Sequence, residues 1–155
     1  MTGPEDDIEY TTSSDSIEYP VLRIPEGGSK NLSLDVIEYS GPAEIATIGG
    51  YDVHHLYVRC TEIDESKLPL DANPREPSRT AQVEAMQDTL ADNPGDFIKK
   101  NNGMAILCGG VDTNGDSDPD SVTLKFNSNE GICNGGHTYF AIQTSEDLHK
   151  SAGVH

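Results

Sequence analysis

The clearest chemical capacity of this chain lies in a glycine turn, Asn134-Gly135-Gly136-His137-Thr138. An apolar, strand-like run precedes the turn and a helix-like pattern follows it. A glycine turn between a strand and a helix exposes backbone N–H groups to an anion such as phosphate. The two glycines allow close approach, and His137 or Thr138 can donate a hydrogen bond or transfer a proton. The segment predicts a phosphate or nucleotide site; the alternative is a plain strand–helix turn with a capping asparagine.

Two further segments carry groups that bind anions. Lys99-Lys100-Asn101-Asn102-Gly103 places two of the six lysines and two amides ahead of a predicted strand. Arg75, one of four arginines, lies in a predicted loop, where a guanidinium can hold an anion through two hydrogen bonds. The competing interpretations are an ordinary Asn-Gly turn and a surface ion pair of Arg75 with Glu76 or Asp71.

The order of these segments resembles the pattern of a known family. The matching pieces are Asn73-Pro74-Arg75-Glu76 with the helix after it, Asn93-Pro94 with Phe97, Asn101-Asn102-Gly103-Met104, and Gly131 to Thr138. Over about residues 71–142 they are similar to the AIPR family, bacterial and archaeal proteins named for abortive-infection phage resistance. Members are generally longer, so the resemblance implies the N-terminal portion of an antiphage-defence protein. In that interpretation one phosphate pocket is formed by Arg75, Asn101, Asn102, Gly103, Asn134, Gly135, Gly136, His137 and Thr138.

The final motif also resembles the Asp-Gly-Gln-His-Arg-type turn of proteins related to ParB and sulfiredoxin, some of which bind or hydrolyse nucleotides. Thr138 stands where that pattern has arginine, which argues against nucleotide hydrolysis. If the pocket does hydrolyse phosphate esters, His137 is the candidate catalytic residue, as general acid or base. Whether the chain is an enzyme is left open.

Other candidate sites have weaker support. The loop Asp112 to Asp120 resembles a calcium loop, but Ser117 stands where glycine is needed and Thr123 where glutamate is needed, so a solvated loop is favoured. His54 and His55 alternate faces of a predicted strand, so they cannot easily chelate one metal. The three cysteines are widely spaced in apolar runs, which favours buried, reduced thiols. We therefore expect no metal site and no cofactor.

The composition limits the class of partner. With 27 Asp and Glu against 10 Lys and Arg, the net charge is −17, so the whole surface repels phosphates and only a local pocket can bind a nucleotide or nucleic acid. The acidity fits either a halophilic prokaryote or an ordinary acidic cytoplasmic protein. We expect no membrane association, because the N-terminus is unlike a signal peptide and no apolar run approaches ~18 residues. The oligomeric state is not indicated.

The predicted fold class is α+β, a mixed sheet with a few helices behind an acidic disordered tail at residues 1–18. The domain would cover residues 19–155 and continue beyond the C-terminus, because neither a cap nor a closing strand is evident there. Helix N-capping is assigned to Ser78. Strands are expected at 19–24, 32–39, 43–48 (or a turn), 54–61, 104–107 and 122–126, and helices at 78–92, 96–100 and 137–148.

The preferred function is the N-terminal part of an AIPR-like antiphage protein that binds a nucleotide or nucleic-acid phosphate at the Asn-Gly-Gly-His-Thr turn. The alternative is a non-enzymatic protein-interaction module of a halophilic prokaryote. The low apolar fraction of 34% and the lack of a recognisable catalytic motif fit that alternative.

Overall fold

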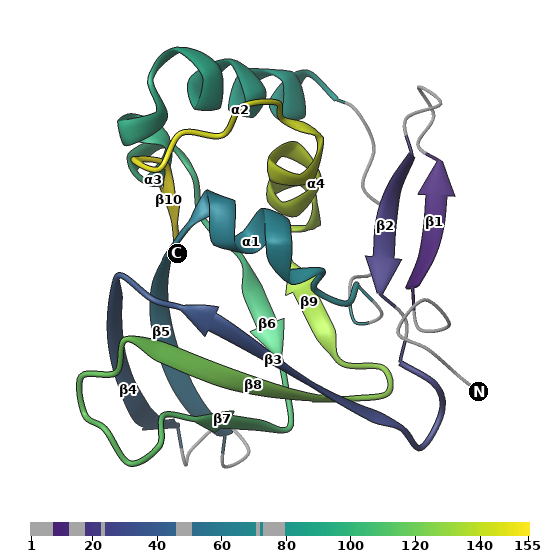
Figure 1. Ribbon diagram of the computed structural model, residues 1–155, viewed down its shortest axis with the longest axis vertical. Coiled ribbons are helices and arrows are strands. Elements are labelled where there is room, and N and C mark those ends of the chain that lie inside the picture. The colour runs from purple at the N-terminus through teal and green to yellow at the C-terminus, as the bar shows by residue number, and fades with distance from the viewer. Residues whose placement is uncertain (1–7, 13–17, 23, 46–50, 71, 73–79) are drawn as a thin grey trace.

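Most of the helices lie toward one end of the molecule and most of the strands toward the other (Figure 1). The computed structural model describes residues 8–12, 18–22, 24–45, 51–70, 72 and 80–155. The helices are α1 Cys60–Ser66, α2 Ala81–Asp92, α3 Phe97–Lys100 and α4 Gly136–Thr144, with a 3-10 turn η3 at Pro94–Asp96. The strands are β1 Ile8–Thr12, β2 Glu18–Leu22, β3 Ser29–Asp35, β4 Glu38–Ile45, β5 Tyr51–Arg59, β6 Ala105–Leu107, β7 Gly110–Asp112, β8 Ser121–Asn127, β9 Gly131–Asn134 and β10 Gly153–Val154.

The strands form small sheets within the described part of the chain. Their orders are β1-β2, β10-β5-β4, β3-β8-β7 and β6-β9, and every pair of these strands is antiparallel. A single parallel bridge joins Leu22 to Pro69. The predicted α+β class is confirmed, although the expected mixed sheet is replaced by these separate antiparallel sheets.

Alternation of apolar and polar residues produces the β3–β8 pair. In β8, Val122, Leu124 and Phe126 are buried while the residues between them face outward. Leu34 of β3 lies opposite Val122 in the register and is also buried. A period of two places one apolar face against the core, so this pair forms one wall of the hydrophobic interior.

Helix α4 lies in the core and ties the helices together. Its Tyr139, Phe140, Ala141 and Ile142 are fully buried, and the Tyr139 hydroxyl accepts a hydrogen bond from the Leu68 N–H at 3.0 Å. Its polar residues reach neighbouring helices: the Gln143 amide donates to the Ile63 carbonyl of α1 at 3.2 Å, and Thr144 accepts from Gln87 of α2 at 2.7 Å. Because these hydrogen bonds join α4 to α1 and α2, they fix the position of α4 and, with it, of its N-terminal turn.

Several predicted elements need correction. The strand expected to reach residue 61 ends at Arg59, because Cys60 and Ile63, three residues apart, turn inward as the buried face of α1. The N-cap of α2 is Thr80, whose hydroxyl accepts from the Val83 N–H at 3.2 Å. Ser78, the predicted cap, lies outside the described residues. The last helix ends at residue 144 rather than 148, with Ser145 as its C-cap.

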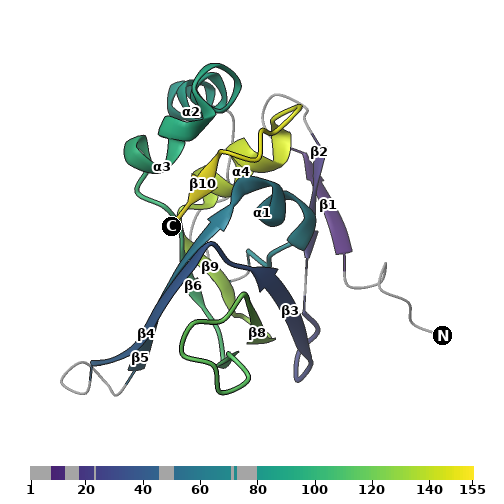
Figure 2. The same cartoon turned by 60° about the vertical axis from the view of Figure 1, so that its left-hand side comes forward.

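The two ends of the described chain also differ from expectation. Residues 8–12 of the predicted tail form β1, which pairs with β2; residues 1–7 and 13–17 lie outside the described part. At the other end, β10 pairs with β5, and the Met104 N–H donates to the His155 carbonyl at 2.8 Å. The prediction that the C-terminal segment lacks a closing strand is therefore wrong. In its sheet β5 lies between β10 and β4, and Figure 2 shows the β4–β5 hairpin reaching away from the helices.

Candidate functional site: a groove beside the N-terminus of helix α4

Two of the three predicted segments meet at one groove. Strand β6 begins just after Asn101-Asn102-Gly103, strand β9 ends at Asn134, and Ala105 pairs with Asn134 in the antiparallel register. The groove has a volume of about 1700 Å³. Of the predicted site residues, it is lined by Asn101, Asn102, Gly103, Asn134, Gly135, His137 and Thr138. Gly136 is buried behind this lining as the first residue of α4.

A side-chain contact joins the two segments. The Thr138 hydroxyl donates to the Asn101 side-chain oxygen at 3.3 Å, and the same oxygen accepts the Gly103 N–H at 2.7 Å. Thr138 is only 5% exposed. Asn101 and Thr138 thus position the two turns relative to each other, whereas the exposed amides of Asn102 and Asn134 face solvent.

Backbone packing requires glycine in the turn. Gly135 has φ +91°, in the left-handed region, and a Cβ there would lie 2.5 Å from the Gly103 carbonyl oxygen. Gly103 also has a positive φ, +81°, and packs against the His155 carbonyl oxygen. Three backbone segments from distant parts of the chain therefore lie in direct contact at the groove floor.

The first turn of α4 offers backbone donors. The first intrahelical hydrogen bond runs from the Tyr139 N–H to the Gly135 carbonyl at 3.1 Å, so the N–H groups of residues 136–138 have no acceptor within the helix. Gly135 supplies no side-chain cap. The aligned peptide dipoles add partial positive charge at this end, which favours an anion. Among the described residues, the His137 imidazole has no hydrogen-bonding or ionic partner.

The groove is poor in carboxylates for so acidic a chain. Among the described residues, its lining contains one carboxylate, Asp52, and one ammonium, Lys100. It also contains four of the five histidines: His54, His55, His137 and His155. An anion therefore meets far less negative charge here than the net charge of −17 would suggest.

Aromatic rings form the wall of the groove at β5. The His55 Nδ1 lies 3.0 Å from the His155 Nε2, and the two rings stack with centroids 5.2 Å apart. Tyr57 stacks on the same His155 ring at 4.6 Å. Sequence reasoning missed Tyr57 and His155, because the contact spans about a hundred residues and only the alternation of β5 points to it. As predicted, His54 and His55 differ in environment: His55 is exposed, while the half-buried His54 contacts the Tyr39 hydroxyl at 2.6 Å.

Burial keeps several groups protonated. It raises the pKa of the Tyr39 phenol, which lines the groove and therefore remains a donor at neutral pH. It also raises the pKa of the Cys108 thiol; a hydrogen bond from the Gly110 backbone partly offsets this effect, while the Glu130 charge adds to it. The pKa of Cys60, which is fully buried, rises to about 12. Neither of these two thiols is thus activated as a nucleophile.

The other predicted residues lie in different places relative to the groove. Arg75 lies outside the described residues. Lys100 lines the groove, whereas the exposed Lys99 forms an ion pair with Asp96 at 3.6 Å. In the predicted polar loop, the carboxylates of Asp112 and Asp116 accept backbone N–H groups two residues ahead, at 2.8 and 3.0 Å. No cluster of three or more His, Cys, Asp or Glu side chains among the described residues is placed to hold a metal ion.

The comparison with protein families decides the relationship that the motifs indicated. The family model described as AIPR protein matches residues 70–155, which is more than half of the chain and includes α2, the Asn101-Asn102-Gly103 turn and the whole of α4. The chain belongs to the AIPR family. Neither a curated protein nor a solved structure matches it. The family is named for abortive-infection phage resistance. Both turns at the α4 end of the groove, Asn101-Asn102-Gly103 and Asn134-Gly135, lie inside the matched residues. No helix described for this AIPR chain has the length and apolar character needed to cross a membrane.

Proposed function

We propose that this AIPR chain acts in phage resistance by binding a phosphate group, from a nucleotide or a nucleic acid, at the N-terminus of α4. The observation that carries the proposal is the pairing of uncapped N–H groups at residues 136–138 with a groove whose described lining residues include a single carboxylate. In a protein of net charge −17, such a place can accept an anion with little repulsion.

The residues take different roles in this proposal. The backbone donors of the first α4 turn hold the phosphate, and Gly135 keeps this turn packed against the Gly103 carbonyl oxygen. Asn102, Asn134 and His137 supply side-chain hydrogen bonds, because they line the groove and Asn102 and Asn134 are exposed. Asn101 and Thr138 hold the two turns together through their own hydrogen bond. Arg75 is a further phosphate ligand under this proposal.

Recognition is a better fit than catalysis. A general acid or base normally needs a second group to fix its orientation, and no described residue forms such a contact with His137. We therefore assign His137 to phosphate binding; it is the first residue to examine if turnover of a phosphate ester is ever observed.

Calorimetric titration of the protein with inorganic phosphate, AMP and ATP tests the proposal. We expect one site, and at least a fivefold loss of affinity in His137→Ala. The matched control is His149→Ala, since His149 is exposed and does not line the groove. Absence of binding by any of the three anions, or equal losses in the two variants, would contradict the proposal.

The rival proposal, a non-enzymatic interaction module of a halophilic prokaryote, is favoured by the acidity of the chain. In that case molar KCl should raise the melting temperature strongly, because it screens repulsion among the 27 acidic residues. A protein that gains stability from salt but not from any phosphate compound would support the rival.

A further inference from the structure

A cluster of exposed cations surrounds strand β10. The structure describes seven Lys and Arg residues: Lys30, Arg59, Lys67, Lys99, Lys100, Lys125 and Lys150. Four of them, Arg59, Lys99, Lys100 and Lys150, gather here, and all four are exposed; we refer to them as the basic cluster. Such a concentration is unusual in a chain of net charge −17.

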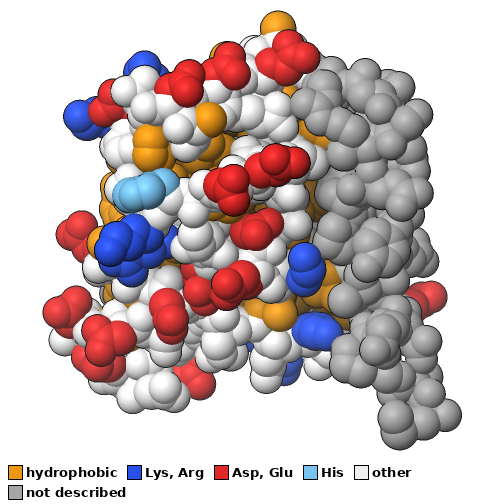
Figure 3. Space-filling view, turned by 45° about the horizontal axis from the view of Figure 1, so that its top comes forward, with side chains coloured by type: hydrophobic (Ala, Val, Ile, Leu, Met, Phe, Trp, Pro, Cys, Tyr) orange, Lys and Arg blue, Asp and Glu red, His pale blue; other side chains and the backbone are white. Residues whose placement is uncertain are grey.

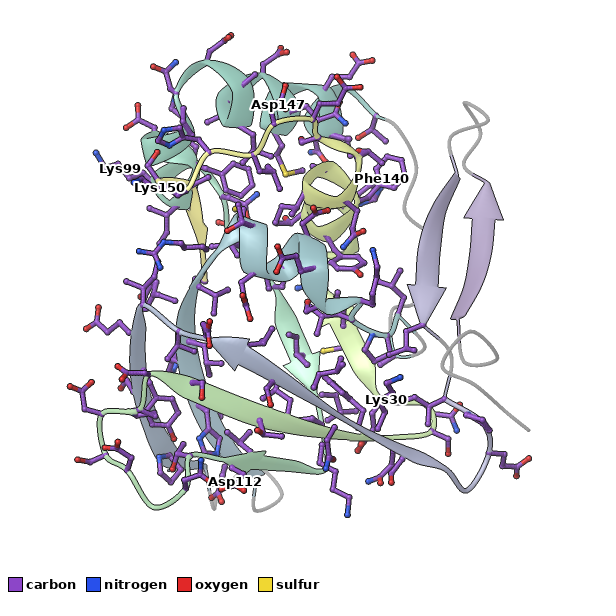
Figure 4. All side chains as sticks on the ribbon, viewed as in Figure 1. Lys30, Lys99, Asp112, Phe140, Asp147 and Lys150 are labelled. Carbon is purple, nitrogen blue, oxygen red and sulfur yellow. The ribbon has the colours of Figure 1, made fainter. Side chains whose placement is uncertain are left out.

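Three chain segments bring these cations together. Gly153 of β10 pairs with Arg59 at the end of β5, and the next residue, Cys60, donates its N–H to the Ala152 carbonyl at 2.9 Å. A Cβ at Gly153 would lie 3.7 Å from Ile98 of α3, so α3 packs on the same strand. Figure 4 shows Lys99 and Lys150 at the same end of the molecule, and on the face in Figure 3 Lys and Arg side chains lie near a histidine at one edge.

The basic cluster is continuous with the groove. Lys100 belongs to both, because it lines the groove at the end of α3. His155, which directly follows β10, also lines the groove and stacks on Tyr57 and His55. Lys100 and the His155 ring therefore connect the basic cluster around β10 with the groove that reaches the α4 turn.

This combination is the one that single-stranded nucleic acids use. Cations follow the phosphate backbone, and flat rings stack on the unpaired bases. We propose that the ligand of this AIPR chain is a single-stranded nucleic acid, with one phosphate at the α4 turn, bases against His55 and His155, and the adjoining phosphates on the basic cluster. The inference rests on the proposed function for the α4 turn and adds the class of ligand to it.

The ion pair of Lys99 with Asp96 does not prevent this role. Its 3.6 Å separation and its exposure, 76% for the Lys99 side chain, mark a weakly held surface pair. In a nucleic-acid strand, a phosphate that is flanked by two other phosphates can replace the Asp96 carboxylate as the partner of Lys99.

Fluorescence anisotropy with a labelled ten-nucleotide single strand, as DNA and as RNA, tests the inference, with a duplex of the same sequence and ATP as competitors. We expect the single strand to bind at least tenfold more tightly than ATP and than the duplex. The variant Lys99→Gln/Lys150→Gln should lose about tenfold in strand affinity at low salt and reduce the slope of log affinity against log salt by about 1.4, since two phosphate contacts are removed. Its affinity for ATP should stay within twofold.

The control is Lys30→Gln/Lys125→Gln, which removes the same charge at β3 and β8; Figure 4 shows Lys30 far from Lys99 and Lys150. An equal loss in the control would mean that net charge alone matters, and a strand that binds no better than ATP would mean that the site takes a mononucleotide; either result overturns the inference while leaving phosphate binding at α4 intact. Strand binding that depends on the basic cluster but is unchanged in His137→Ala would instead overturn the proposed α4 site.

Discussion

The Thr138 hydroxyl donates to the Asn101 side-chain oxygen at 3.3 Å, and this contact connects the two turns of the groove across 37 residues of sequence. Asn101 uses the same oxygen to accept the Gly103 N–H. One amide therefore fixes the shape of its own turn and the position of the neighbouring one. The relative placement of the exposed amides, on which the proposed anion binding depends, follows from this pair.

Removing the Thr138 hydroxyl should loosen that connection. Thr138→Val keeps the shape of the buried side chain but cannot donate, so we expect a loss of about 1 kcal/mol in the free energy of unfolding. Thr138→Ser, which keeps the hydroxyl, should lose less. Urea denaturation of both variants makes the comparison; equal stability of Thr138→Val and the parent protein would show that the hydrogen bond contributes nothing.

Gly135 should be far less tolerant of a side chain than Gly27 or Gly95. Gly135→Ala combines a φ of +91° with a contact 2.5 Å from the Gly103 carbonyl oxygen, so we expect a loss of at least about 2 kcal/mol. Two controls separate the causes. Gly27 has φ +77° but open space, so Gly27→Ala should cost about 1 kcal/mol, from strain alone.

The second control, Gly95→Ala, meets neither strain nor contact and should change stability by less than about 0.5 kcal/mol. Thermal melts of the three variants should rank them in that order. If Gly135→Ala and Gly27→Ala have the same melting temperature, this result would contradict the close approach of Gly135 to the Gly103 carbonyl oxygen.

The N-cap of α2 provides a local test of the fold. Thr80→Ala removes the acceptor of the Val83 N–H and should lower the free energy of unfolding by about 1 kcal/mol, whereas Thr80→Ser should be nearly neutral. Denaturant titration of the two variants distinguishes them. Equal losses would point to the methyl group rather than to the cap.

The buried thiol of Cys60 should make the protein sensitive to alkali. Burial raises its pKa from 9.0 to about 12, so the folded state holds this proton more tightly than the unfolded state does. The resulting stability is complete below pH 9 and is lost as the pH rises toward 12; at 1.36 kcal/mol per pH unit it reaches roughly 4 kcal/mol.

The difference between parent and Cys60→Ala in unfolding free energy, measured at intervals from pH 8 to pH 11, isolates this effect from other titrating groups. We expect the advantage of the parent to shrink steadily above pH 9. A difference independent of pH would contradict the burial of the thiol.

Much of the fold could be predicted from local patterns in the sequence. Alternation in β8 and the 3.6-residue period of α2 identified both elements, because each buries one face against the core. α1 was missed since its two inward residues, Cys60 and Ile63, are too few to establish a helical period after a β-prone run. β10 was missed because a two-residue strand has no period at all; only its pairing with β5 defines it.

The site was predictable in part for the same reason. Glycines next to polar residues marked both turns, and the resemblance to the AIPR family implied that they share one pocket. The role of Asn101 as a positioning residue and the stacking of His155 on Tyr57 depend on contacts between distant residues, which spacing along the chain does not encode.

The central claim, that the α4 turn binds phosphate, is tested most directly by calorimetric titration of Asn134→Asp with ATP. The substitution keeps the size of the side chain, and a carboxylate near a helix N-terminus favours the helix, so the fold should be retained. It also places a negative charge beside the proposed phosphate. We predict at least a tenfold loss of affinity in Asn134→Asp and less than a twofold change in Asn31→Asp, which makes the same replacement on an exposed position of β3. Equal affinity of Asn134→Asp and the parent protein would contradict the account.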